Sequence, residues 1–138
     1  MADLNKDILQ ADVVHAGEYG NAARATRSYT GALSSGDVLH IIRLPANTEL
    51  HDLDLFHGVG GAGAVVDVGY VPVDPANGAG DPDYFLDAAD VAAAGRKRAN
   101  TALKPVRLPY AVDITVTAGA AVASNEITAS VQYEWRGR

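Results

Sequence analysis

The sequence predicts an all-β domain, and three observations carry this prediction. Period-two alternation of apolar and polar residues recurs along the chain, and glycines and prolines separate the alternating segments. Leu, Ile, Val and Phe together supply 33 of the 138 residues, which is above the roughly 20% below which disorder becomes common. The length of 138 residues predicts a single domain with a packed core.

Seven segments fit β-strands. The last is the clearest, because Ile127, Val131 and Trp135 alternate with polar residues. The segment 106–110 fits an edge strand, since proline donates no backbone hydrogen bond to a neighbouring strand. In chain order the predicted strands are 25–30, 37–44, 49–57, 64–70, 106–110, 112–117 and 127–135.

The small residues of 118–125 are typical of a hairpin loop between the last two predicted strands. A connection this short cannot make a parallel crossover. We therefore expect the strands 112–117 and 127–135 to be antiparallel neighbours in one sheet.

One short helix is predicted on the long excursion 73–104 between strands. Asp81 is a suitable capping residue, a proline follows it in the first turn, and Tyr84, Ala88 and Val91 share one helical face. A glycine and three cations follow, which is the pattern of a helix C-terminus. Long excursions in compact domains usually carry function, so this segment is a candidate contact surface.

Residues 1–22 fit neither period, and we expect them to form an N-terminal arm before a single β domain over 23–138. Two interpretations are open: an arm ordered only against a partner, or a terminal segment packed on its own domain. Apolar side chains of this arm include Leu4, Ile8, Leu9 and Val13.

A glycine motif invites a cofactor interpretation that its context does not support. Gly58, Gly60 and Gly63 spell G-x-G-x-x-G after a predicted strand. This motif holds a dinucleotide only where a helix begins at the third glycine. Alternating β-branched residues follow here, so we predict a turn between two strands and no cofactor.

We also predict no catalytic residues and no metal site. On a regular strand, His51 and His57 lie on the opposite face from Asp52 and Asp54. The two histidines are also roughly 20 Å from each other, although a β-bulge would re-aim one of these side chains. The chain has no cysteine, which excludes disulfides, a thiol nucleophile and a zinc–thiolate site. No nucleophile elbow or phosphate-binding loop is present.

The charge and hydropathy patterns exclude two further classes. A net charge of −6 argues against a dedicated nucleic-acid-binding protein. No apolar run approaches the roughly 20 residues that a membrane-spanning helix needs. The basic run 96–98 fits either a solvated helix end or a contact with an acidic partner surface.

The order of these features resembles the small cement, or decoration, proteins of tailed-phage capsids, particularly the jelly-roll type of short-tailed phages. The likeness covers most of residues 24–135. The segments that carry it are Gly36-Asp37-Val38, Leu44-Pro45-Ala46, Leu53-Asp54-Leu55, Val66-Asp67-Val68-Gly69-Tyr70, Asp83-Tyr84-Phe85-Leu86-Asp87-Ala88 and the strand from Ile127 to Tyr133.

The resemblance implies a jelly-roll-like β-sandwich or barrel and a non-enzymatic virion protein. Such a protein would be made in the host cytoplasm and would bind the capsid exterior. It would bridge major capsid protein subunits as a homodimer, with a trimer as the alternative, and would contact neither nucleic acid nor membrane. Residues expected to touch the capsid are Leu4, Ile8, Leu9, Val13, Tyr84, Phe85, Arg96, Lys97 and Arg98.

Two other functions stay open. A small-ligand or carbohydrate-binding β-sandwich would need an aromatic platform. A metal-dependent enzyme would need clustered His and Glu side chains, which the spacing of His51 and His57 does not predict. The candidate platform residues are Tyr70, Tyr84, Phe85, Tyr110 and Trp135.

Overall fold

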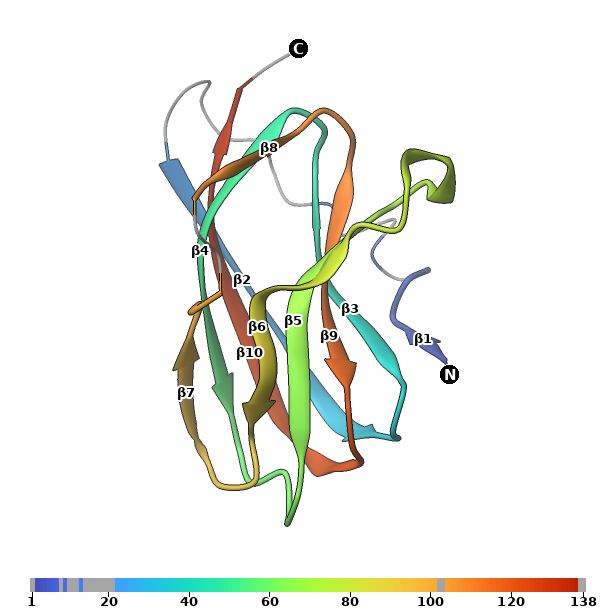
Figure 1. Cartoon of the computed structure of the whole chain (residues 1–138), viewed down its shortest axis with the longest axis vertical. Helices are drawn as coiled ribbons and strands as arrows, with labels where there is room; N and C mark the ends of the chain where they lie inside the picture. Colours follow the sequence, from blue (N-terminus) through green and yellow to red (C-terminus); the bar gives the residue numbers. More distant parts are fainter. Residues whose placement is uncertain (1, 8, 10–12, 14–21, 102–103, 137–138) are drawn as a thin grey trace.

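The computed structural model describes residues 2–7, 9, 13, 22–101 and 104–136. In this part of the chain two β-sheets lie face to face, as Figure 1 shows. The strands are β1 (Asp3–Leu4), β2 (Ala22–Leu33), β3 (Val38–Leu44), β4 (Thr48–His57), β5 (Val65–Pro72), β6 (Asp81–Asp90), β7 (Gly95–Arg98), β8 (Val106–Leu108), β9 (Val112–Ala118) and β10 (Val122–Trp135).

The strand order is that of a jelly roll. One sheet has the order β1-β3-β9-β5-β6, and the other has β2-β10-β4-β7, with β8 paired to the first residues of β4 and β7 to its last residues. Apart from the parallel pair β1–β3, all strand pairs within these sheets are antiparallel. The chain crosses between the sheets at most of its connections, so strands close in sequence face each other across the core.

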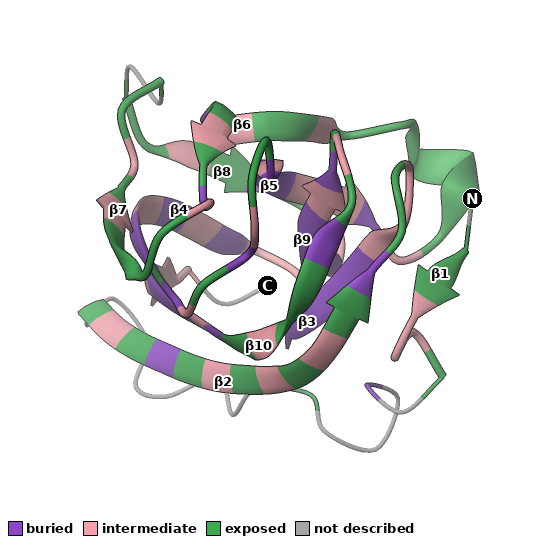
Figure 2. Cartoon of the chain, turned by 90° about the horizontal axis from the view of Figure 1, so that it is seen from below, coloured by how far each residue is buried: buried purple, intermediate pink, exposed green. Residues whose placement is uncertain are grey.

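The hydrophobic core lies between the two sheets. Figure 2 shows buried residues along β3, β9 and β5 in one layer and along β4 and β10 in the other. Burying each large aliphatic side chain contributes about 1.5–3 kcal/mol. The largest fully buried side chains are Phe85, Leu33, Leu39, Ile42, Leu44, Leu50, Leu53, Leu55, Leu86, Ile114, Val66 and Val68.

All seven predicted strands are present, with boundaries shifted by a few residues. Strand β2 is the most extended relative to its prediction, running over Ala22–Leu33 where the sequence indicated 25–30. The glycine motif is a connection between β4 and β5, as predicted. In it the backbone N–H of Gly60 donates to the carbonyl of Val91, and Gly61 has a positive φ of 93°.

The predicted helix is wrong, because its segment forms β6 and β7. Strand β6 pairs with β5 through an irregular register, in which Val68 lies opposite Leu86 and Tyr70 lies opposite Asp81. Ala88 has a φ of +51°, and its backbone N–H donates to the Asp67 carboxylate at 2.6 Å. Pairing with a neighbouring strand therefore overrides the helical spacing.

Helical structure in the described ranges is limited to Leu9, which has 3₁₀ geometry, and to a 3₁₀ turn, η2, at Pro75–Asn77, where the Asp74 carboxylate accepts the Ala76 N–H. No helix in this part of the chain is long and apolar enough to cross a membrane.

The expected pairing of the last two long strands is also wrong. Strand β9 lies between β3 and β5, whereas β10 lies between β2 and β4 in the opposite sheet. The short connection between them passes from one sheet to the other, and the Gly119 N–H in it donates to the Val65 carbonyl. Both strands have one strongly apolar face, and the two faces meet across the core instead of side by side.

The described parts of the arm 1–22 lie against the domain. Strand β1 pairs in parallel with β3, with Asp3 opposite Val38 and Leu4 opposite Leu39. Val13 forms an isolated parallel bridge with Arg43. These residues fit the second interpretation of the arm, a terminal segment packed on its own domain; Ile8 and residues 14–21 lie outside the described residues.

The bulged pairing of β5 with β6 depends on Gly69. A Cβ atom at this position would overlap the carbonyl oxygen of Asp81 and the backbone of Pro82. We expect Gly69→Ala to lower the free energy of unfolding by about 2 kcal/mol or more, as in overpacked cores. The matched control is Gly95→Ala, where the nearest atom is His57 Cε1 at 3.7 Å. Urea unfolding of both variants tests this, and equal effects would contradict it.

Candidate functional site

A buried polar network fastens the N-terminal segment to the sheet. Asp113 on β9 is 0% exposed and accepts hydrogen bonds from Arg43 Nε at 2.7 Å and Arg43 Nη2 at 3.0 Å. His40 Nδ1 lies 2.8 Å from Asp113, and its Nε2 lies 3.2 Å from Asp3 on β1. Arg43 also donates to the carbonyl of Lys6 at 3.2 Å. The network therefore connects β1, β3 and β9.

Alternation explains why this network exists. Asp113 lies between the core residues Val112 and Ile114, so its side chain is on the opposite face of the sheet from the core. Burial acts to raise the pKa of Asp113, but hydrogen bonds from His40 and Arg43 outweigh burial and lower it. The bond to Asp113 likewise raises the pKa of Arg43 against the effect of burial.

The predicted contact residues of the N-terminal segment have different surroundings. Leu4 is half-buried and packs against the core, and Leu9 is only 5% exposed. Leu9 is therefore corrected from a free anchor to a residue packed on its own chain. Val13 is 46% exposed, which leaves it accessible to a partner.

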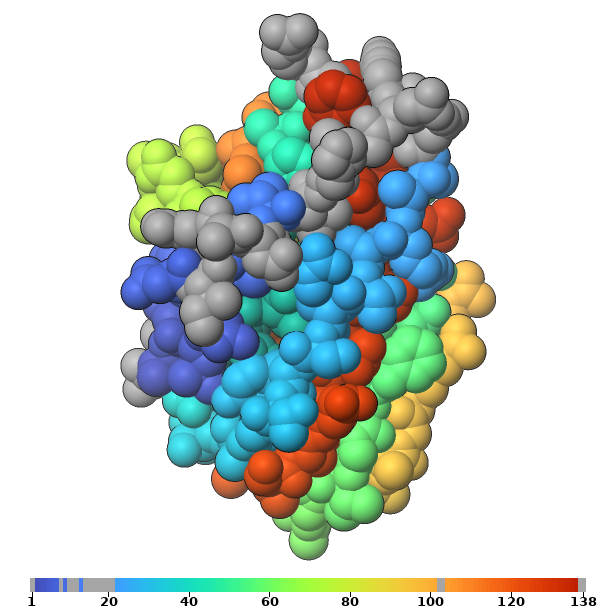
Figure 3. Space-filling model, turned by 180° about the vertical axis from the view of Figure 1, so that it is seen from behind, coloured from blue at the N-terminus to red at the C-terminus, as the bar shows by residue number. Residues whose placement is uncertain are grey.

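The predicted basic residues form an outer edge of the β2-β10-β4-β7 sheet. Figure 3 shows this face, with β7 along one border. Arg96 lies 3.1 Å from Asp54 and over the ring of the exposed Phe56, with 5.4 Å to its centroid. Arg98 lies 2.8 Å from Asp52. These cations form ion pairs on a charged face. The sequence predicted that they end a helix, and this prediction is wrong.

The ion pair of Arg98 with Asp52 also affects the pKa of Asp52. Burial acts to raise the pKa of Asp52, but hydrogen bonds from Arg98 and from the Leu53 N–H lower it overall. Lys97 lies between the two arginines, opposite Leu55 in the register, and is half-buried. The alternation that puts Asp52 and Asp54 on one face of a regular strand puts Phe56 on that face too, and Phe56 is 40% exposed.

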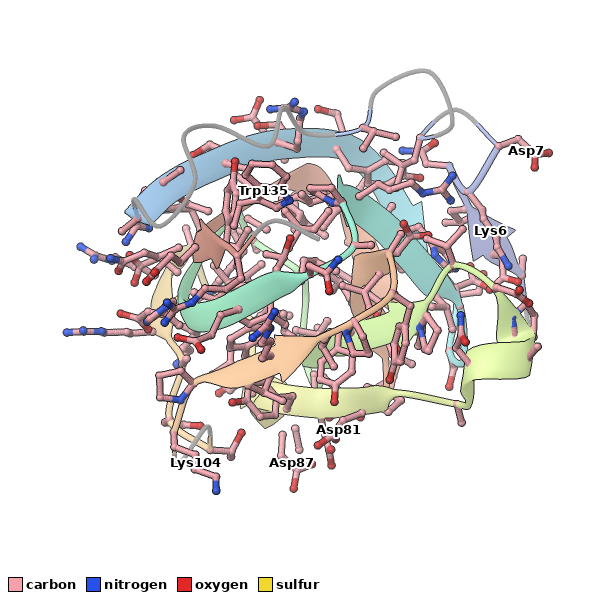
Figure 4. All side chains as sticks on the ribbon, turned by 90° about the horizontal axis from the view of Figure 1, so that it is seen from above. Lys6, Asp7, Asp81, Asp87, Lys104 and Trp135 are labelled. Atoms are coloured by element: carbon pink, nitrogen blue, oxygen red, sulfur yellow. The ribbon has the colours of Figure 1, made fainter. Side chains whose placement is uncertain are left out.

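Tyr84 lines an open hollow of about 400 Å³ on the outside of β6. Figure 4 shows Asp81, Asp87 and Lys104 on this side of the molecule. The Tyr84 hydroxyl donates to the Lys104 carbonyl, and its ring packs edge-on against Tyr70 at 5.6 Å. Phe85 is corrected from a contact residue to a core residue, because it is 0% exposed. The hollow is lined by Asp81, Asp83, Tyr84, Asp87, Thr101, Lys104, Pro105 and Val106.

The carboxylates of this hollow lie on strand β6, so Asp81 does not cap a helix as the sequence predicts. In the structure a hydrogen bond with Asp83 raises the pKa of Asp81, and partial burial and the charge of Asp83 act in the same direction. Asp81 therefore holds its proton more tightly than an isolated carboxyl group does.

The two histidines of β4 do not share a site. His57 is buried, and its Nδ1 lies 3.3 Å from the Gly58 carbonyl. His51 lies beside carboxylates instead. Among the described residues, one group has ligand atoms close enough together for a single metal ion: Glu49, His51 and Glu134.

Comparison by sequence finds no match to the chain, either among protein-family models or among curated proteins. Solved structures do match. A chain in the capsid of Ralstonia phage GP4 has a TM-score of 0.75 and 19% identity, with 100% of both chains covered. A chain in the cyanophage Pam1 capsid has a TM-score of 0.61 and 20% identity, covering 89% of this chain and 91% of that one.

A third match is a chain in the acid-stable capsid of the Helicobacter pylori bacteriophage KHP30. Its TM-score is 0.58 at 17% identity, with 87% of this chain and 92% of that chain covered. The fold is thus that of jelly-roll chains found in phage capsids. The resemblance noted in the sequence is confirmed at the level of the fold.

Asp113 supplies a test of the buried network. Asp113→Asn is expected to lower the free energy of unfolding at pH 7 by about 3–5 kcal/mol, because Arg43 and His40 lose an ionised partner in the interior. Because the folded-state pKa of Asp113 is lowered, its stabilisation is present above the unfolded pKa of about 3.9 and is lost as pH falls through the folded value.

Urea unfolding at pH 7 and at pH 3 measures this dependence. We expect the difference in the free energy of unfolding between wild type and Asp113→Asn to be smaller at pH 3 than at pH 7. The exposed Asp87→Asn is the control, with an expected effect within about 0.5 kcal/mol at both pH values. If the difference in the free energy of unfolding were the same at both pH values, the carboxylate charge of Asp113 would contribute nothing to stability.

Proposed function

We propose that this chain is a non-enzymatic structural protein of a phage virion that binds the outer surface of the capsid. The observation that carries the proposal is the match to a chain of the GP4 capsid, which runs over the whole length of both chains. Two further phage capsids contain chains of the same fold.

The size of the matched chains supports decoration in particular. At least 91% of each matched chain aligns with a chain of 138 residues, so each is itself a small protein. A small domain of this kind adds to a shell that a larger subunit builds. The partner in this proposal is the major capsid protein, and the site of action is the capsid exterior after synthesis in the host cytoplasm.

In the proposed mechanism, binding of this protein stabilises the assembled shell. A protein that binds the assembled shell and bridges neighbouring subunits stabilises the shell by its free energy of binding, summed over many copies. A homodimer, or alternatively a trimer, would span more than one capsid subunit and so resist the outward pressure of packaged DNA. The jelly roll itself provides a rigid support for the contact surfaces.

Two surfaces are proposed to contact the capsid. The first is the N-terminal segment, where Val13 is exposed beside Arg43. The second is the β7 edge, where the side chains of Arg96 and Arg98 are 60% and 72% exposed and Arg96 lies over the ring of Phe56. An arginine beside an aromatic ring is typical of residues that contribute strongly to interfaces.

The function is tested by mixing the purified chain with expanded shells that lack it. We expect saturable co-sedimentation and a rise in the temperature at which filled shells release DNA. Electron microscopy of the decorated shells would show added density on the outside. Density confined to the inside, or no co-sedimentation at any concentration, would contradict the proposal.

The N-terminal contact is tested separately. Deleting residues 1–20 should leave a folded domain that no longer attaches to shells, since Asp113 still pairs with Arg43 and His40. Val13→Asp is expected to weaken attachment about tenfold, because it puts a charge in an apolar contact. The control is Val59→Asp, which alters another exposed valine, 61% exposed, in the β4–β5 connection. Wild-type occupancy with the deletion would exclude this surface.

A second candidate function is binding of a small ligand or carbohydrate, and the hollow beside Tyr84 favours it. An aromatic ring flanked by carboxylates suits the apolar face and hydroxyls of a sugar. A glycan array with wild type and Tyr84→Ala distinguishes the functions. Specific glycan binding that is lost in Tyr84→Ala would support carbohydrate binding as the function. The absence of binding to any glycan on the array would contradict it.

A further inference from the structure

A β-bulge changes the outer face of β4 at His51. The register with β10 pairs Asp52 with Gln132 and then Leu50 with Tyr133, which leaves His51 as the extra residue. Leu50 and Leu53 are both fully buried, so His51 and Asp52 lie next to each other on the outer side of the strand. The bulge thus separates His51 from the inward-facing set to which simple alternation had assigned it.

The re-aimed imidazole meets two carboxylates. Glu49 lies two residues before it on β4, and Glu134 lies directly opposite Glu49 on β10. His51 Nε2 is 3.1 Å from Glu49 Oε1 and 3.6 Å from Glu134 Oε2. All three side chains are largely shielded, with 28%, 20% and 16% of the His51, Glu49 and Glu134 side chains exposed.

Two features of this cluster call for a cation. Like charges directly opposite each other on paired strands destabilise a sheet unless they are neutralised. In addition, the His51 Nε2 atom is buried and makes no hydrogen bond, although it faces both carboxylates. Arg136 supplies partial neutralisation, with its guanidinium 3.5 Å from Glu49 and 3.2 Å from Glu134.

We propose that Glu49, His51 and Glu134 form a binding site for a divalent transition-metal ion of the zinc class. Zinc takes imidazole nitrogen and carboxylate oxygen at about 2.0–2.2 Å in a tetrahedral arrangement, which puts two ligand atoms about 3.4 Å apart. The observed separations of 3.1 and 3.6 Å bracket this value. The imidazole ligand disfavours calcium and magnesium, which prefer oxygen.

Three protein ligands leave one tetrahedral position for water or another donor. The ion would join β4 to β10 near the end of β10, whose last residue, Trp135, is labelled in Figure 4. Arg136 competes with the ion, because it uses the same two carboxylates. Zinc binding at these three residues does not require binding to a capsid.

Isothermal titration of the full chain with ZnCl₂, in a buffer that does not chelate metal, tests the site. We expect one zinc ion per chain. His51→Ala and Glu134→Gln should each weaken binding roughly tenfold or more. Glu126→Gln is the matched control, because it makes the same change at an exposed position on the same strand.

Arg136→Gln separates the metal site from a simple salt-bridge cluster. Removing the competing guanidinium should tighten zinc binding roughly threefold to tenfold, whereas a structural ion pair would only lose stability. This gain is measurable even if His51→Ala fails to fold, which circular dichroism would reveal. The proposal is overturned if neither wild type nor Arg136→Gln binds zinc, or if folded His51→Ala binds it as wild type does.

Discussion

The buried carboxylate of Asp113 is the constraint on which much of this structure depends. It lies on a central strand, outside the apolar core but without exposure to solvent, so it needs hydrogen-bond donors nearby. Arg43 and His40 on β3 supply them, and the same two side chains reach Lys6 and Asp3. One carboxylate thereby fixes the pairing of two strands and the course of the N-terminal segment.

The second sheet uses charge differently. Its outer face carries pairs such as Arg96 with Asp54 and Arg98 with Asp52, which link neighbouring strands while remaining partly in water. Pairs of this kind add little to stability. They keep an edge strand charged, which discourages unspecific strand addition and leaves specific contacts possible. The bulge at His51 adds a cluster that regular alternation would have kept apart.

The strands were predictable because each directs mainly apolar side chains to its core face and mainly polar ones to the other, and this leaves a period of two in the sequence. The sequence wrongly predicted a helix over 81–95, because Tyr84, Ala88 and Val91 have helical spacing. The structure pairs this segment with β5 through bulges, which makes Phe85 and Leu86 both buried although they are consecutive. Phe85 therefore belongs to the core, while Tyr84 beside it lines a hollow.

By itself, the sequence determined that the domain is built mainly of β-strands, where seven of these strands lie and that its glycine motif is a turn, because these properties follow from local spacing. Only the tertiary structure decided which strands pair, that β9 and β10 lie in opposite sheets, and that Asp113, His51 and Glu134 meet residues far away in the chain. Such contacts depend on how the two sheets face each other to bury their apolar sides, and local spacing carries no record of that arrangement.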